Sequence, residues 1–116
     1  MATITNYGGH ATAGQALDEV VHRLAEALNP VAIYLFGSRA RGTARPDSDF
    51  DLLVVTRAED GGAGYDYARA YAPLAGRGIA CDVVPVPLPD FLEDKDDPTS
   101  LCFEAVHHGQ KIYECG

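Results

Sequence analysis

Two aspartates stand two positions apart where an apolar run begins. Asp49 and Asp51 lead into residues 52–55, which are all Leu or Val. Because side chains alternate along a strand, both carboxylates should share one face while Phe50 points to the other. Two like charges on one face cost stability unless a cation lies between them, and Mg²⁺ or Mn²⁺ suits such hard oxygens. The pair therefore predicts a metal site. A solvated turn is the alternative, but it does not explain why Asp51 continues into the strand.

A third carboxylate, Asp82, is the lone charge of the apolar segment 79–84. A buried carboxylate without a partner is costly, so this position predicts a cation or a hydrogen-bond donor nearby. If the two strands are neighbours, all three aspartates can face one pocket. Two divalent ions about 3.5–4 Å apart, held by such a set, would stabilise the attacking and leaving oxygens of an in-line phosphoryl or nucleotidyl displacement.

A phosphate-holding turn is expected just before these aspartates. The apolar run 31–36 ends in Gly37 and Ser38, and a short helix follows. The N–H groups at a helix N-terminus can bind a phosphate oxygen, the Ser38 hydroxyl can add a donor, and Gly37 allows close approach. Taken alone this signal is weak, because Ser is a common helix cap.

The elements that must position these residues follow from hydrophobic periodicity. A first amphipathic helix begins at Ala13 and stops at Asn29-Pro30. Strands are expected over 31–36, 49–55 and 79–86, and further helices over 64–75 and 101–106, the second of them capped by Thr99 or Ser100. Residues 90–97 read as a solvated acidic loop that can contain one helical turn. Gly109 is expected as a left-handed helix end, and 111–114 as an edge strand. These elements predict a mixed α/β (α+β) domain, with a three- to four-stranded mixed sheet and about three helices.

Length, charge and cysteine usage limit the function classes. A chain of 116 residues suits one domain, which we place at 13–116 behind a flexible arm over 1–12. The formal net charge of -8 disfavours nucleic acid as a partner. Three cysteines without a Cys-x-x-Cys pair suggest reduced thiols, and no apolar stretch is long enough to span a membrane. We therefore expect a cytoplasmic protein without a membrane segment.

Gly37-Ser38, ten intervening residues and Asp49-Phe50-Asp51, with Asp82 downstream, resemble the motif of the DNA polymerase β-like nucleotidyltransferase superfamily. The sequence is most similar to the minimal nucleotidyltransferase (MNT) domains, many of them antitoxins encoded with HEPN toxins. The resemblance extends over residues 13–114. It implies a small nucleotidyltransferase fold, with Gly37 and Ser38 holding a nucleoside triphosphate. It further implies two Mg²⁺ ions, or Mn²⁺, on Asp49 and Asp51, with Asp82 completing the first metal site beside the attacking hydroxyl. AMP transfer from ATP to a tyrosine of a HEPN toxin is the implied reaction.

Arg39, Arg41 and Arg45 surround the predicted phosphate site and make up three of the nine basic residues. We predict nucleotide contacts for Arg39 and Arg41, and neutralisation of the aspartates is an equal alternative for each. Other residues with possible chemistry have structural readings. Tyr67 and Tyr71 are expected in the core although, like Tyr65, they could stack a base; His107 and His108 are expected at a helix C-terminus, and Cys81 as a small buried hydrophobe.

Two other functions compete with an active antitoxin enzyme. A binding antitoxin could keep the fold and block its partner sterically, although the intact aspartates and Gly-Ser argue against that degeneracy. Transfer to a small molecule such as an aminoglycoside is weaker, because the sequence leaves no room for an added helical substrate domain. The lack of an acceptor domain favours a partner protein, or self-association into a homo-oligomer, as the source of the missing wall.

Overall fold

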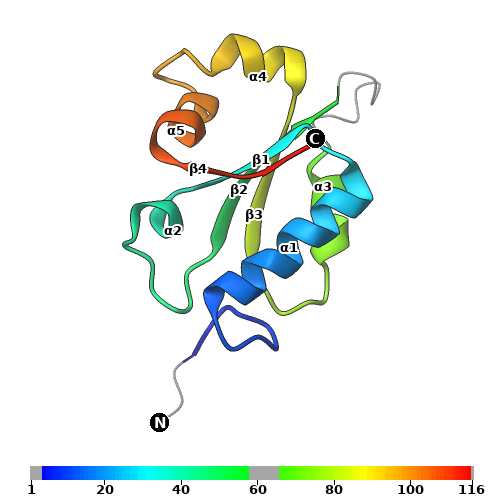
Figure 1. The fold of residues 1–116 in the computed structure, drawn as a ribbon, viewed down its shortest axis with the longest axis vertical. Coiled ribbons are helices and arrows are strands. Elements are labelled where there is room, and N and C mark those ends of the chain that lie inside the picture. Colours follow the sequence, from blue (N-terminus) through cyan, green and yellow to red (C-terminus); the bar gives the residue numbers. More distant parts are fainter. Residues whose placement is uncertain (1–3, 58–65, 116) are drawn as a thin grey trace.

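The computed structural model describes residues 4–57 and 66–115, and within them one four-stranded sheet carries helices on both faces (Figure 1). The sheet order is β3-β2-β1-β4. The strands are β1 (Ala32–Phe36), β2 (Phe50–Thr56), β3 (Cys81–Pro87) and β4 (Gln110–Glu114). β1 is antiparallel to both β2 and β4, whereas β2 and β3 are parallel. The mixed α+β class and the four-stranded sheet confirm the sequence prediction.

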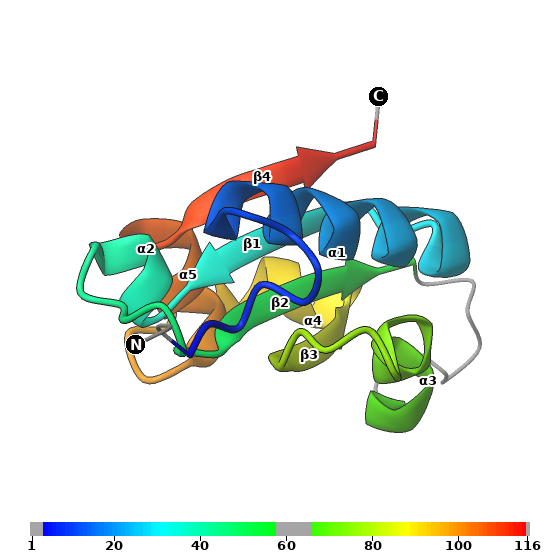
Figure 2. The same cartoon turned by 90° about the horizontal axis from the view of Figure 1, so that it is seen from below.

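Helices α1 (Ala13–Leu28) and α3 (Tyr67–Tyr71), the latter continued by the 3₁₀ turn η3 (Ala72–Leu74), lie on one face of the sheet. Helices α4 (Leu88–Asp94) and α5 (Leu101–His108) lie on the other, and the short α2 (Ser38–Arg41) follows β1 (Figure 2). Two buried clusters separate accordingly. One joins α1 to Ile33, Leu52 and Val54, and the other joins Tyr34, Leu53 and Val55 to Phe91 and Ala105. The alternation of strand side chains produces this division.

Helix α1 has the bounds that its periodicity predicts. The Thr12 side chain accepts a hydrogen bond from the Gln15 N–H, and Asn29 ends the helix in the left-handed conformation with φ 46°. Val20 and Leu24 are almost fully buried against the sheet. A polar N-cap and an Asn C-cap together leave few backbone groups unpaired at the two ends.

The prediction of a solvated loop over 90–97 is wrong in part, because the helix α4 occupies Leu88–Asp94. Pro89 lies in the first turn, where its missing N–H costs nothing, and Phe91 is buried with its ring stacked on Tyr34 at a centroid distance of 5.6 Å. The strand β3, expected to end at residue 86, extends to Pro87. Pro85 and Pro87 lie within it, and an edge strand tolerates them because one of its sides needs no N–H donors.

Helix α3 differs from the expected helix over 64–75, of which residues 64 and 65 lie outside the part described. Tyr67 and Tyr71 are exposed, so their prediction as core residues is wrong. Leu74, which the same expected stripe contains together with Ala75, is buried as predicted, and Ala70 is buried in place of the tyrosines. Both the tyrosines and the pair Ala70/Leu74 have helical spacing, so only the neighbouring elements decide which side of the helix faces the sheet.

Ser100 caps α5 by accepting a hydrogen bond from the Phe103 N–H, which confirms one of the two predicted caps. Cys102 and Ala105 are its buried residues, whereas Leu101 is exposed. The prediction of a left-handed conformation for Gly109 is wrong, since its φ is -102°. Gly109 is needed for space: a Cβ there would collide with the carbonyl oxygens of Leu35 and Ala105.

The described part of the N-terminal segment does not lie free, in contrast to the flexible arm expected over 1–12. Asn6 is buried, and its backbone N–H donates to the carbonyl of Pro46. His10 approaches Glu19 of α1 at 2.7 Å between Nε2 and Oε1. Polar composition suggested solvent exposure, but the polar groups of this segment bind other parts of the chain. No helix of the described residues is long and apolar enough to span a membrane.

Candidate active site

Asp51 and Asp82 are direct neighbours on the parallel strands β2 and β3. Both precede, at even spacing, residues of the α4/α5 face: Asp51 precedes Leu53, and Asp82 precedes Val84. They lie at the edge where β1 ends and β2 and β3 begin, which we call the site edge. Asp82 is exposed, so the expectation of a buried charge is wrong for this residue. Its place near the start of an edge strand leaves the carboxylate open to solvent.

Asp49 precedes β2, which begins at Phe50, and its side chain is exposed. Strand alternation was expected to place Asp49 on the same face as Asp51, but it does not determine the direction of the Asp49 side chain because β2 begins at Phe50. The charge of Asp49 nevertheless acts on Asp51. Burial raises the pKa of Asp51, and the negative charges of Asp82 and then Asp49 raise it further. The three aspartates thus form one interacting group at the site edge.

Little within the described residues neutralises this group. The positive charge of Arg41 opposes the rise in the pKa of Asp51. Arg41 is exposed, and it also forms an ion pair with Glu104 at 3.5 Å between Nη1 and Oε1. Among residues 4–57 and 66–115, none of the three aspartate side chains accepts a hydrogen bond or forms an ion pair. An exposed ion pair such as Arg41–Glu104 contributes at most about 1 kcal/mol, so it cannot hold Arg41 firmly away.

Gly37 brings the end of β1 against Asp51. Its φ of 74° and ψ of -154° fall in a region that is essentially restricted to glycine. A Cβ at this position would also collide with the Asp51 carboxylate. The backbone conformation therefore requires glycine, and any larger residue would also displace the Asp51 carboxylate. Gly37 takes the cap position of α2, so Ser38 is the first helical residue rather than the cap that the sequence suggested. The Ser38 side chain makes no hydrogen bond within the described chain.

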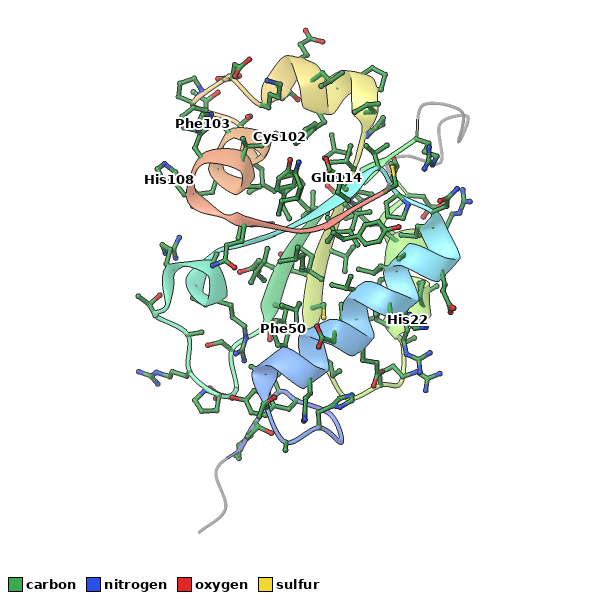
Figure 3. The ribbon with its side chains drawn as sticks, viewed as in Figure 1. His22, Phe50, Cys102, Phe103, His108 and Glu114 are labelled. Atoms are coloured by element: carbon green, nitrogen blue, oxygen red, sulfur yellow. The ribbon has the colours of Figure 1, made fainter. Side chains whose placement is uncertain are left out.

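Arg39 points to the other face of the sheet from the aspartates. Its guanidinium lies 4.2 Å from the ring centre of Phe50, whose side chain belongs to the α1 cluster. Figure 3 shows Phe50 beside the first turns of α1, with His108 at the end of α5 across the sheet. The Nη2 group donates to the carbonyls of Ser48, Arg45 and Pro46. Arg39 thus binds the loop that leads to Asp49.

The comparisons decide the family. The model of the nucleotidyltransferase domain family matches residues 17–112, which contain every element of the site edge. The chain belongs to this family of nucleotidyltransferase domains. It also resembles the crystal structure of a candidate nucleotidyltransferase from Sulfolobus solfataricus, with 20% sequence identity, a TM-score of 0.54, and coverage of 84% of this chain and 77% of that one. At this identity the likeness supports the fold alone. No curated protein matches the chain.

A nucleotidyltransferase domain generally uses divalent metal, so the aspartates can be tested for their fit to it. Three carboxylates at one edge, with one of them raised in pKa by the others, provide the hard oxygen donors that Mg²⁺ prefers. The side chains are not yet gathered: within the described ranges no three His, Cys, Asp or Glu residues are close enough to hold a metal ion. The donor type and the shared charge fit a divalent cation, and binding would have to draw the exposed Asp49 and Asp82 towards Asp51.

Other residues of this nucleotidyltransferase domain have structural positions. His107 and His108 lie in the last turn of α5, where the sequence placed them. Cys81 is half-buried on the α1 face, opposite Asp82, and burial raises the pKa of its thiol to about 12, so it is a poor nucleophile. Asn6, which contacts the segments before Asp49 and Asp82, was missed. It stands between Thr5 and Tyr7, and no local pattern distinguishes it.

Proposed function

We propose that this nucleotidyltransferase domain transfers AMP from ATP to a hydroxyl acceptor, with Asp49, Asp51 and Asp82 binding Mg²⁺. The acceptor we propose is a tyrosine of a HEPN-family partner, so that the chain acts as an antitoxin. The observation that carries the metal-dependent reaction is the group of three carboxylates at the site edge, against which the Gly37 backbone packs at Asp51. The acceptor and the antitoxin role rest on the sequence resemblance.

The residues around Asp51 supply what a triphosphate needs. Gly37 allows the turn that follows β1 to pass directly against Asp51, and the Ser38 hydroxyl makes no bond within the described chain that a ligand would have to break. Arg41 lies close enough to lower the pKa of Asp51, so it can approach the same phosphates. Two bound Mg²⁺ ions would supply the positive charge that stabilises the attacking and leaving oxygens.

In the proposed reaction the acceptor oxygen attacks the α-phosphorus of ATP. A new oxygen–phosphorus bond forms, the bond from the α-phosphorus to the bridging oxygen breaks, and pyrophosphate leaves. Asp82 is exposed at the start of β3, where an incoming hydroxyl can reach it, and its place beside Asp51 suits it to orient that hydroxyl. The hydroxyl proton is lost to a carboxylate or to solvent during the attack. Arg41 offsets negative charge on the phosphates.

The net charge favours a protein acceptor over a nucleic acid. A chain with a formal charge of -8 repels phosphate backbones unless its cations gather on one face. Of the three arginines near the site edge, Arg39 is committed to backbone carbonyls on the α1 side and Arg41 pairs with Glu104. We therefore expect only non-specific binding to duplex DNA or RNA, with Kd of roughly 10⁻⁴ to 10⁻⁶ M at physiological salt.

The test is transfer of label from α-labelled ATP in Mg²⁺, with and without the product of the neighbouring gene. We expect label on that partner, retained after denaturation and mapped by mass spectrometry to a tyrosine, with release of pyrophosphate. Asp51→Asn serves as the inactive control. Inhibition of the partner by wild type and Asp51→Asn alike, without labelling, would replace the enzyme by a steric antitoxin. Labelling of a small-molecule hydroxyl alone would replace the acceptor class.

A further inference from the structure

The buried side chain of Asn6 joins two backbone segments that carry aspartates. Its Nδ2 group donates to the carbonyl of Ser48 at 3.1 Å and to the carbonyl of Ala80 at 2.8 Å, and its Oδ1 accepts from the Ala80 N–H at 2.6 Å. Ser48 comes directly before Asp49, and Ala80 lies two residues before Asp82. With 7% of its surface exposed and both polar atoms of its side chain hydrogen-bonded, Asn6 ties these two segments together.

Arg39 binds the first of these segments from another element. Its Nη2 donates to the Ser48 carbonyl at 2.7 Å, and to the carbonyls of Arg45 and Pro46 at 3.2 Å each. The Ser48 carbonyl therefore accepts from both Asn6 and Arg39. Stacking on Phe50, and a distance of 5.7 Å from the Tyr7 ring centre, fix the guanidinium plane. A planar fork with several donors suits this arrangement, and an ammonium group does not.

These contacts matter because the aspartates have no comparable support of their own. Their side chains accept no hydrogen bonds within the described residues, and their like charges repel. The distance between Asp49 and Asp82 is consequently set by the backbone on which they stand. Asn6 bridges that backbone directly, and the Phe50 N–H adds a bond to the Ala80 carbonyl at 3.1 Å.

We propose that Asn6 and Arg39 are positioning residues: they fix the backbone before Asp49 and Asp82, from which both carboxylates can turn to bind one divalent cation. The inference rests on the proposed function, and it gives the N-terminal segment a role in the metal site. It also gives Arg39 a role other than the nucleotide contact that the sequence suggested. Side chains behind metal ligands commonly change metal affinity or activity by 10- to 100-fold when removed.

The test measures Mn²⁺ binding to the nucleotide-free chain, by the electron paramagnetic resonance of free Mn²⁺, beside transfer kinetics. Asn6→Ala and Arg39→Lys are compared with His10→Ala, which alters the same N-terminal segment at its contact with Glu19. All are measured at a temperature where circular dichroism shows them folded. We expect the Kd for Mn²⁺ to rise about 10- to 100-fold in the first two, with a fall in kcat, and to stay unchanged in His10→Ala.

Arg39→Lys keeps the variant set informative if Asn6→Ala does not fold, because it retains the positive charge. We expect it to weaken Mn²⁺ binding while the KM for ATP stays within about twofold, whereas a phosphate-binding arginine would show the opposite pattern. Wild-type Kd values in both variants would overturn the inference and leave the proposed function standing. Loss of Mn²⁺ binding without detectable transfer in wild type would support the inference and count against the proposed reaction. A wild-type chain that binds no Mn²⁺, either alone or with a non-hydrolysable ATP analogue, would overturn both.

Discussion

The loop that ends at Asp49 presents two contrasting sides. On the α1 side, the carbonyls of Arg45, Pro46 and Ser48 are bound by Arg39 and Asn6. At the site edge, the aspartate carboxylates have no hydrogen-bond partner within the described chain. Satisfied polar groups hold a structure in place, whereas unsatisfied charges lower its stability and attract ligands. The α1 side of the loop therefore stabilises the fold, and the site edge provides the groups that can bind a ligand.

Asp51→Asn should have the largest effect on activity, because it removes the charge at the centre of the site edge. Nucleotide transfer should fall by several orders of magnitude, since a neutral amide binds a hard cation weakly. Stability in EDTA should stay equal or rise by at most about 1 kcal/mol, because solvent screens the repulsion at a half-buried carboxylate. The measurements are transfer in Mg²⁺ and chemical denaturation in EDTA.

The sign of that stability change follows from the raised pKa of Asp51. A carboxyl whose pKa is higher in the folded than in the unfolded state contributes stability below its unfolded pKa, and this contribution is lost as pH rises through the folded pKa. At neutral pH the charged form therefore weakens the fold, and Asn removes that cost. A loss of about 1–3 kcal/mol with activity retained would instead make Asp51 a structural residue.

Divalent cation should stabilise the wild type through the site edge. A ligand that binds only the folded chain adds about 2.7 kcal/mol at one hundred times its Kd. Thermal midpoints should rise with Mg²⁺ or Mn²⁺ over those in EDTA, and Asp51→Asn should show a much smaller rise. Equal wild-type midpoints in both conditions, with and without a non-hydrolysable ATP analogue, would contradict the metal site.

Gly37→Ala tests the close approach of β1 to Asp51, with Gly42→Ala as its matched control. Both glycines have positive φ, 74° and 77°, but only a Cβ at Gly37 meets other atoms, those of Asp51. We expect Gly37→Ala to lose about 1–3 kcal/mol of stability and most transfer activity. Gly42→Ala should lose about 1 kcal/mol with activity kept. Similar activity in the two variants, measured below both midpoints, would contradict a role for the Gly37 approach.

Arg41→Gln should give the smallest effect. Arg41 lowers the pKa of Asp51, so its removal should raise that pKa further and move the acid limb of the pH–rate profile to higher pH. Glu104→Gln removes the partner of Arg41 and should leave that limb in place or move it to lower pH. Stability should change by less than about 1 kcal/mol in both. An unshifted limb in Arg41→Gln would place Arg41 outside the electrostatics of the site.

Local patterns in the sequence predicted much of the fold. Periodicity and caps gave the bounds of α1, and the apolar runs gave the strands of a mixed sheet. They failed where two readings were locally equal. For α3 the periodicity predicted the burial of Leu74 correctly, but both Ala70 and Tyr71 lie at helical spacing from it, and only the sheet decided that Ala70 faces inward. The acidic stretch of α4 read as loop, because its buried residue, Phe91, packs on Tyr34 in a distant part of the chain.

For the candidate site, the sequence by itself determined which residue types stand near one another: the glycine before a helix, and aspartates at the starts of two strands. Their chemistry follows from spacing, because alternation and strand ends are local properties of the backbone. Only the tertiary structure decided which strands are neighbours, so that Asp51 pairs with Asp82, and which groups hold them there. Asn6 donates hydrogen bonds to Ser48 and Ala80, which are 42 and 74 positions away in the sequence. Arg39 binds backbone carbonyls, whereas the sequence had suggested that it contacts the nucleotide. Such partners depend on where distant segments meet, which no local pattern of residues encodes.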